Sequence, residues 1–245
     1  MSELSDFRPY TLGRIRGEDI DPIPFPHRFV ANVFPEDFYL QLRLNWPSID
    51  EMKSISGTER ITDGKYKERN ILAVSKKELG KLPEKKRDFW LQAGELLMDK
   101  SFMYDIISVF QPYVDQRFQY LKGPIDINPD ALIVTDTSNY SIGPHTDVPA
   151  RIISLLFYCP DDANMSHLGT SIYAPKEPGF SCEHGQHYEF DQFNRVETFQ
   201  YLPNSMLGFV RTNNSFHGVE TIFENHIKRD LLLYHIRTKP EQIRN

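Results

Sequence analysis

The stretch SNYSIGPHTD, residues 138–147, decides how the rest of the chain is interpreted. It places His145 and Asp147 two positions apart, and side chains at i and i+2 of a β-strand project from the same face. A second imidazole, His217, comes much later, in the strand-like run SFHGVE at residues 215–220. Two histidines and one carboxylate on one side of a metal ion leave its opposite side open to other ligands. The pattern therefore predicts an open metal site.

The donor atoms of these residues suit a catalytic metal. Imidazole nitrogen and carboxylate oxygen are ligands for Fe(II), and no thiolate beside them favours zinc. A three-ligand site also keeps positions free for a chelating cosubstrate and O₂. The tripeptide His-x-Asp alone is weak evidence for a metal site, because it is common by chance. In the alternative interpretation, His145 lies in a loop and Asp147 forms a turn before Pro149.

Blocks of characteristic sequence surround these residues in a fixed order. They are YSIGPHTD (140–147), ARIISLLFYCPDD (150–162), GTSIYAP (169–175), PNSMLGFVRTNNSFHGVETI (203–222) and KRDLLLY (228–234). As an ordered set they resemble the Fe(II)/2-oxoglutarate-dependent dioxygenase superfamily, and most of all its prolyl-hydroxylase-like branch. The resemblance covers Asp130 to Arg237, and a weaker likeness extends to PFPHRFVANVFPEDFYLQL at residues 24–42.

This resemblance implies a cofactor set and a reaction. His145, Asp147 and His217 would bind Fe(II), with 2-oxoglutarate and O₂ as cosubstrates. The protein would hydroxylate an unactivated C–H bond of a small molecule, with release of succinate and CO₂. Related halogenases carry a small residue in place of the carboxylate. The intact Asp147 therefore favours hydroxylation, or another oxygenase outcome such as desaturation.

The family places a basic residue about ten to twelve positions after the second histidine, where it pairs with the distal carboxylate of 2-oxoglutarate. Lys228 and Arg229 both stand at this distance. Strand alternation puts Lys228 on the face of Asp230, whose charge would repel a bound carboxylate, whereas Arg229 offers a two-pronged donor. We expect Arg229 to be the anchor, although an irregular strand would reverse the choice. Leu231 departs from the family's pattern of Ser or Thr two residues later.

Further residues are candidates for the same site. Tyr140 resembles the family's tyrosine that hydrogen-bonds 2-oxoglutarate, but a tyrosine in a strand is more often half-buried core. Arg151 follows the His-x-Asp turn and would contact an anionic substrate or cosubstrate, unless it is an exposed strand end. We expect Thr170 and Tyr173 to line the wall of the substrate pocket.

The periodicity of the chain changes near residue 125. Residues 1–24 are polar and broken by Gly and Pro, and we expect an irregular lead-in there. Residues 48–70 are charged and suggest an exposed loop or a lid. Apolar residues between 83 and 118 recur at helical spacing, and Pro112 should end or kink a helix. Short β-rich runs bounded by turn residues then follow.

Helices first and strands afterwards predict an α+β protein, a double-stranded β-helix (jelly roll) with N-terminal buttressing helices. We expect a single oxygenase domain over residues 1–245. Residues 1–125 would form mainly helical support and the entry segment, and residues 126–240 the jelly-roll core with the metal site. Residues 48–81 and 176–200 would shape the mouth of the pocket.

The composition is that of a globular protein, with 40% hydrophobic and 25% charged residues. A net charge of −6 argues against nucleic acid as a partner, and no apolar run is long enough to span a membrane. The first residues lack the features of a signal peptide, and the two cysteines are too few for a disulfide framework. We therefore expect a cytoplasmic protein that binds a small-molecule substrate, in an oligomeric state that the sequence does not indicate.

Other readings of the chain remain open. Cys182, His184 and His187 could form a zinc site with His167 as a distant fourth ligand, although they lack a second ligand pair at finger-like spacing. The fold could also serve a non-catalytic jelly-roll protein that binds a small molecule. A cupin-type dioxygenase that does not use 2-oxoglutarate is a further alternative.

Overall fold

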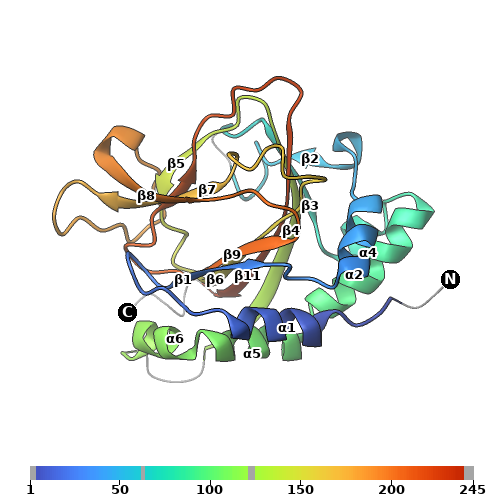
Figure 1. Cartoon of the computed structure of the whole chain (residues 1–245), viewed down its shortest axis with the longest axis horizontal. Helices are drawn as coiled ribbons and strands as arrows, with labels where there is room; N and C mark the ends of the chain where they lie inside the picture. Colours follow the sequence, from blue (N-terminus) through green and yellow to red (C-terminus); the bar gives the residue numbers. More distant parts are fainter. Residues whose placement is uncertain (1–3, 62–63, 121–124, 240–245) are drawn as a thin grey trace.

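Two antiparallel β-sheets form the centre of the molecule in the computed structural model, which describes residues 4–61, 64–120 and 125–239 (Figure 1). The larger, seven-stranded sheet has the order β1-β9-β6-β11-β4-β3-β2, and the smaller, four-stranded sheet has the order β5-β10-β7-β8. The larger sheet contains β1 (His27–Ala31), β2 (Lys53–Ser54), β3 (Arg69–Ala73), β4 (Ile127–Thr137), β6 (Arg151–Tyr158), β9 (Ser205–Val210) and β11 (Lys228–Thr238). The smaller sheet contains β5 (Ile142–His145), β7 (Thr170–Pro175), β8 (Phe193–Phe199) and β10 (His217–Val219).

Helices pack against the outer face of the larger sheet. Figure 1 shows α1, α5 and α6 beneath this sheet and α2 and α4 at its side. The helices are α1 (Arg8–Gly17), α2 (Glu36–Leu44), α3 (Lys76–Leu79), α4 (Glu84–Leu97), α5 (Lys100–Val109) and α6 (Gln111–Phe118), with short 3₁₀ turns at Ile49–Glu51 and Phe190–Gln192. The layered arrangement of helices and antiparallel sheets confirms the predicted α+β class.

The central strands of the larger sheet are covered on both faces, and this explains their composition. In β6, every residue after Arg151 is buried, so the run IISLLFY is almost continuously apolar. Ile153 and Leu155 belong to the core that the helices share, whereas Leu156 and Tyr158 pack between the two sheets. A strand with one solvated face would alternate polar and apolar residues instead.

Helix α4 supplies the largest side chain of the helical layer. Trp90 is fully buried, and its indole Nε1 donates a hydrogen bond of 2.8 Å to the Asn45 backbone oxygen at the end of α2. Its ring meets that of Trp46 edge-on, with ring centroids 6.0 Å apart. The apolar spacing that predicts helices between residues 83 and 118 therefore reflects packing against this core.

Several segments differ from the sequence prediction. Residues 8–17 form α1 rather than an irregular lead-in, and the loop expected at residues 48–70 contains β2 and the start of β3. Residues 193–199, within the segment expected to shape the pocket mouth, form the edge strand β8, which the sequence prediction did not include. Since β1 and β3 join the larger sheet, the first 125 residues contribute strands as well as helices.

The position of Pro112 agrees with the prediction that this residue ends or kinks a helix. It lies at the start of α6, directly after α5 ends at Val109. Proline is tolerated in the first turn of a helix, where its missing N–H would have no intrahelical partner. The residue therefore separates two helices rather than bending one.

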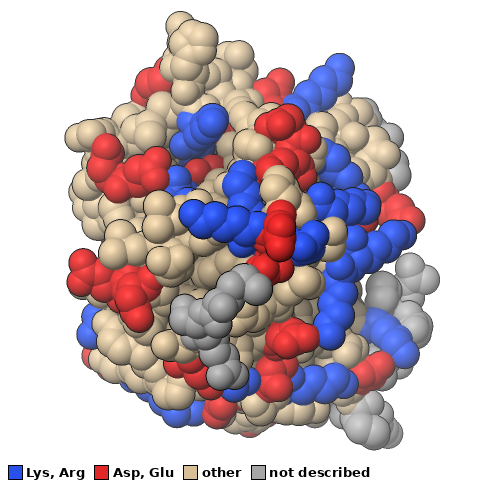
Figure 2. All heavy atoms as spheres, turned by 90° about the vertical axis from the view of Figure 1, so that its right-hand side faces the viewer, with Lys and Arg blue, Asp and Glu red and all other residues tan. Residues whose placement is uncertain are grey.

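The surface over α2, α3 and α4 carries many charges of both signs. Figure 2 shows Lys and Arg side chains gathered on this face with Asp and Glu side chains among them. Three lysines there lie within ion-pair distance of an acid: Lys76 of Glu95 (2.9 Å), Lys81 of Glu78 (2.8 Å) and Lys86 of Glu51 (2.6 Å). Among the residues described, no helix is both long and apolar enough to cross a bilayer.

Replacement of Trp90 by Ala should destabilise the fold strongly. The substitution leaves a cavity in the helical core and removes the hydrogen bond to Asn45. We expect the free energy of unfolding, measured by urea denaturation, to fall by about 3–5 kcal/mol. Leu40→Ala, at a position 55% exposed on α2, is the control and should change it by less than about 1 kcal/mol. Equal effects of the two substitutions would contradict this packing.

Candidate metal centre

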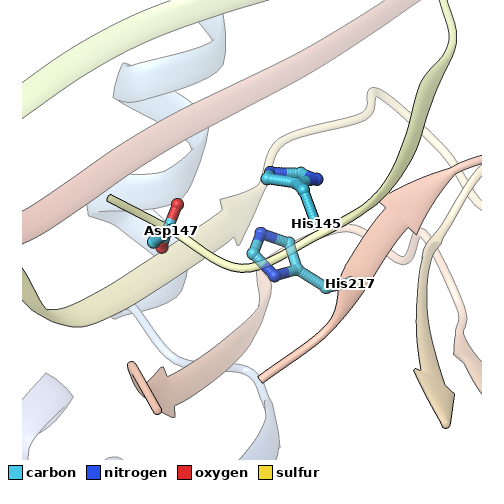
Figure 3. A group of neighbouring side chains, drawn as sticks. All are labelled: His145, Asp147 and His217. Atoms are coloured by element: carbon cyan, nitrogen blue, oxygen red, sulfur yellow. The ribbon is translucent and has the colours of Figure 1, made fainter. Parts of the chain in front are cut away.

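Two neighbouring strands of the smaller sheet bring the two histidines together. His145 is the last residue of β5, His217 is the first of β10, and the two residues are directly paired across these strands. Asp147 lies in the loop beyond β5, and one ligand atom from each of the three residues lies within 4.8 Å of the others. Figure 3 shows the three side chains as neighbours around the loop that follows β5.

The local geometry therefore differs from the i, i+2 arrangement that the sequence suggests. Because β5 ends at His145, strand alternation does not orient Asp147. Contacts to the carboxylate orient it instead. The Ser154 hydroxyl donates a hydrogen bond of 2.5 Å to Oδ2, and the Arg151 guanidinium donates to Oδ1. Both partners come from β6, which begins just after the loop.

Backbone carbonyls orient the two imidazoles. His145 Nδ1 lies 2.9 Å from the Gly143 oxygen, and His217 Nδ1 lies 3.0 Å from the Ser215 oxygen. A carbonyl oxygen only accepts, so each Nδ1 carries the proton and each Nε2 keeps its lone pair. Metal-bound histidines are usually held in this way by a hydrogen bond from the second ring nitrogen.

Burial and the neighbouring charges favour the metal-binding protonation states. Burial lowers the pKa of His145 well below its ordinary value, and the two neighbouring imidazoles lower it further. Burial also lowers the pKa of His217, against the opposing effect of Asp147. Burial alone would raise the pKa of Asp147, but Arg151 and nearby imidazoles hold it well below its usual range. At neutral pH the site therefore offers two neutral imidazoles and a carboxylate.

The three residues line a cavity of about 60 Å³ between the sheets, together with Tyr140, Arg151, Thr170 and Arg229. Arg229 is only 1% exposed, and its guanidinium donates to the Leu168 oxygen (2.6 Å), to Asp136 (3.0 Å) and to Thr170 Oγ1 (3.0 Å). Lys228 is exposed and lines a different cavity, beside Arg43 and Asp230. Of the two adjacent basic residues, Arg229 is thus the one that faces the histidines' cavity.

The remaining candidates fall into two groups. Tyr140 is fully buried, and its hydroxyl makes no hydrogen bond within the ranges that the structure describes. Thr170 lines the cavity and accepts a hydrogen bond from Arg229. Tyr173 is not among the residues that line this cavity and packs instead with Phe190 and Phe193. The expected role of Tyr173 in the pocket wall therefore has no support from its position.

Four residues of this site were not identified from the sequence. Arg69, Ser154 and His235 line the cavity, and Asp136 bonds to two of its arginines. His235 Nδ1 lies 3.1 Å from Ser154 Oγ, and its Nε2 has no hydrogen-bond partner among the described residues. Alternation along β11 could have indicated His235, because Arg229, Leu231, Leu233 and His235 all line the cavity. Arg69 lies on β3, at the end of the segment for which the sequence predicts a loop.

The alternative zinc cluster does not form. Among residues 4–61, 64–120 and 125–239, the only group of three potential metal ligands is His145, Asp147 and His217. His187 lies with its ring centroid 4.4 Å from that of His145, whereas His184 lines a different cavity, together with Val148 and Pro149. Cys182 is a buried free thiol.

Comparisons with known proteins identify a solved structure with a similar fold. No protein-family model matches the chain, and no curated protein matches it. Among solved structures, a prolyl-4-hydroxylase from Pseudomonas putida is similar, with 13% identity and a TM-score of 0.53 over 94% of this chain and 100% of that one. The chain shares the fold of this prolyl-4-hydroxylase. The double-stranded β-helix predicted from the sequence is thereby confirmed.

Two further solved structures are similar at lower scores. A dioxygenase for auxin oxidation from rice has 14% identity and a TM-score of 0.49, over 88% of this chain and 74% of that one. AviO1 from Streptomyces viridochromogenes Tue57 has 15% identity and a TM-score of 0.47, over 97% of both chains. In this chain, the three potential metal ligands lie on β5, on β10 and in the loop after β5.

The buried histidines should make the metal-free protein sensitive to mild acid. Burial lowers the pKa of His145, His217 and His235 in the folded state, so the unfolded chain binds more protons below about pH 6.5. Stability is then greatest above that pH and falls as the pH decreases, by on the order of 1 kcal/mol per pH unit for each histidine.

Urea denaturation of metal-free protein between pH 7.5 and 5.5 measures this slope. Exposed His184 is the control position, and His184→Gln should leave the slope unchanged, whereas His235→Gln should reduce it. An unfolding free energy that stays constant over this range would contradict the burial of neutral imidazoles at the site.

Proposed function

We propose that this protein is an Fe(II)- and 2-oxoglutarate-dependent oxygenase that hydroxylates an unactivated C–H bond of a small molecule. The observation that carries the proposal is a single cavity lined by two histidines, one carboxylate and a buried arginine. The first three side chains form an open metal site, and the arginine offers a counter-charge for an acid. The similarity to a prolyl-4-hydroxylase in fold is consistent with this activity.

The donor set fits a divalent iron ion. Nε2 of His145, Nε2 of His217 and a carboxylate oxygen of Asp147 would hold it, and these side chains are already oriented by Gly143, Ser215 and β6. A site with two neutral imidazoles and one carboxylate suits Fe(II) better than the soft metals that prefer thiolates. No thiol belongs to the group of three ligands in the described chain.

The side chains that line the cavity also suit a 2-oxo dicarboxylic acid. Arg229 would pair with the carboxylate remote from the metal, and the Tyr140 hydroxyl, which lacks a partner in the described chain, would donate to the same ligand. Burial raises the pKa of Tyr140 far above its ordinary value, so this hydroxyl stays protonated and available as a donor. A buried polar atom without a partner is rare in a folded protein unless a ligand or water completes it.

Bound iron and 2-oxoglutarate would together supply the oxidising chemistry, with succinate and CO₂ as products. The residues of this chain would position the iron and 2-oxoglutarate and shield them from water. His145, Asp147 and His217 hold the metal, while Arg151 and Ser154 keep the Asp147 carboxylate in place. The apolar side chains of Leu156, Leu231 and Leu233, which also line the cavity, would limit the access of water.

We propose Arg151 and Thr170 as substrate contacts, because both line the cavity. Tyr173 is not proposed, since it packs in the separate aromatic cluster with Phe193 and Phe216. We further propose that the chain acts as one domain, because β1 and β3 complete the same sheet that contains β6 and β11.

Anaerobic titration of Fe(II) and 2-oxoglutarate into metal-free protein tests the proposal. We expect a weak visible charge-transfer band from chelated 2-oxoglutarate. Asp147→Ala should abolish the band by removing a ligand. Arg229→Ala should weaken 2-oxoglutarate binding at least about tenfold, because it removes a buried charged donor.

Lys228→Ala is the matched control, since it removes the neighbouring positive charge from an exposed position outside the cavity. A band lost in Lys228→Ala but kept in Arg229→Ala would reverse the choice of anchor. No band in wild-type protein with iron shown to be bound would favour a cupin-type enzyme or a non-catalytic binding protein.

A further inference from the structure

Three charged residues form a row across three adjacent strands at one end of the cavity. Arg69 on β3 is directly paired with Asp136 on β4, and Asp136 is directly paired with Arg229 on β11. Residues opposite one another in adjacent strands present their side chains on the same face of a sheet. The two guanidiniums therefore flank one carboxylate, and both line the cavity that contains the metal ligands.

The contacts in this row are close and buried. Arg69 binds Asp136 with two parallel hydrogen bonds, from Nε to Oδ1 (2.6 Å) and from Nη2 to Oδ2 (2.9 Å). Arg229 Nη1 donates to Oδ2 of the same carboxylate at 3.0 Å. Asp136 and Arg229 are no more than 1% exposed, and the Arg69 side chain is 15% exposed.

The charges in this row do not balance. Two guanidiniums share one carboxylate, which leaves one positive charge uncompensated in a buried place. An uncompensated buried charge is costly, and a bound anion with a single carboxylate would complete the set. The row is thus suited to one carboxylate group of a ligand.

The free donors are distributed unequally between the two arginines. A guanidinium has five N–H groups. Arg229 directs its three nitrogens to Leu168, Asp136 and Thr170, so every nitrogen is already engaged. Arg69 uses only Nε and Nη2, and its Nη1 has no hydrogen-bond partner among the residues described. Arg69 therefore has more donors available to a ligand than Arg229 has.

Tyr140 holds Arg69 on its other side. The Arg69 guanidinium lies over the Tyr140 ring, 4.4 Å from its centroid, and the Tyr140 hydroxyl has no hydrogen-bond partner among the described residues. Stacking on an aromatic face restricts a guanidinium that would otherwise sample many conformations. Asp136 and Tyr140 together fix Arg69 in the cavity wall.

We propose that Arg69 is a second anion-binding arginine of this site, and that Arg69 and Arg229 together bind the carboxylate remote from the metal in a 2-oxo dicarboxylic acid. This inference rests on the proposed function. It assigns to β3, outside the blocks of sequence that resemble the dioxygenases, a direct part in selecting the cosubstrate. Recognition of the remote carboxylate would then depend on both arginines, and Arg69 would offer it more free N–H donors than Arg229.

The test measures selectivity for the remote carboxylate by calorimetry and does not require turnover. Metal-loaded protein without O₂ is titrated with 2-oxoglutarate and, separately, with 2-oxopentanoate, in which a methyl group replaces the remote carboxylate. We expect Arg69→Gln to weaken binding of 2-oxoglutarate at least about tenfold and to leave binding of 2-oxopentanoate nearly unchanged. The preference of wild-type protein for the dicarboxylate should therefore be largely lost.

Arg60→Gln is the matched control. Arg60 also forms a two-pronged ion pair with an aspartate of β4, Asp130, but it does not line this cavity. A loss of selectivity shared by both variants would reflect net charge alone and would overturn the inference. Arg69→Lys keeps the positive charge but lacks the two-pronged guanidinium, and it should cause an intermediate loss of selectivity. It also serves as the test variant if thermal melting shows that Arg69→Gln does not fold.

The outcomes separate this inference from the proposed function. If metal-loaded wild-type protein binds neither 2-oxo acid, the proposed function fails and the inference fails with it. If wild-type protein prefers 2-oxoglutarate and both Arg69 variants keep that preference, only the role of Arg69 is overturned. Equal weakening of both ligands by Arg69→Gln would also overturn it, because the arginine would then support the cavity without recognising the carboxylate.

Discussion

The pairing of β5 with β10 is the contact on which the candidate site depends. It sets His145 directly opposite His217, so two imidazoles from distant parts of the sequence share one side of the smaller sheet. A shift of one residue in this register would turn His217 to the opposite face. Gly218 permits the close approach, since a Cβ there would lie 2.6 Å from the Ile142 oxygen. The loop that follows β5 then needs to position only one further side chain, Asp147.

The sequence predicted the parts of the fold that depend on local pattern. Helices at residues 84–118 and most strands after residue 126 follow from apolar spacing and β-rich runs. Strand β3 was missed because RNILA is short and follows a charged segment, and it forms through pairing with β4, which lies far away in sequence. Helix α1 was missed because its apolar residues are few and are buried only by tertiary packing, as with Leu12 and Ile15. Patterns within one segment do not reveal such long-range partners.

The same distinction applies to the candidate site. His145, Asp147, His217 and Arg229 were predicted from ordered motifs, and the structure places all four around one cavity, although their roles stay predictions. Arg69, Asp136 and His235 could not be found in the same way, because each gains its importance from a neighbour on another strand. Tyr173 shows the opposite error. Its motif suggested the pocket wall, but the register of β7 turns its ring toward a separate aromatic cluster.

The support around the three candidate ligands comes from the protein itself. Ser154 and Arg151 hold the Asp147 carboxylate, and backbone oxygens hold both imidazoles. A zinc finger differs, because its folding requires the metal. Here the packing that stabilises β5, β6 and β10 is also the packing that keeps the ligand set in place.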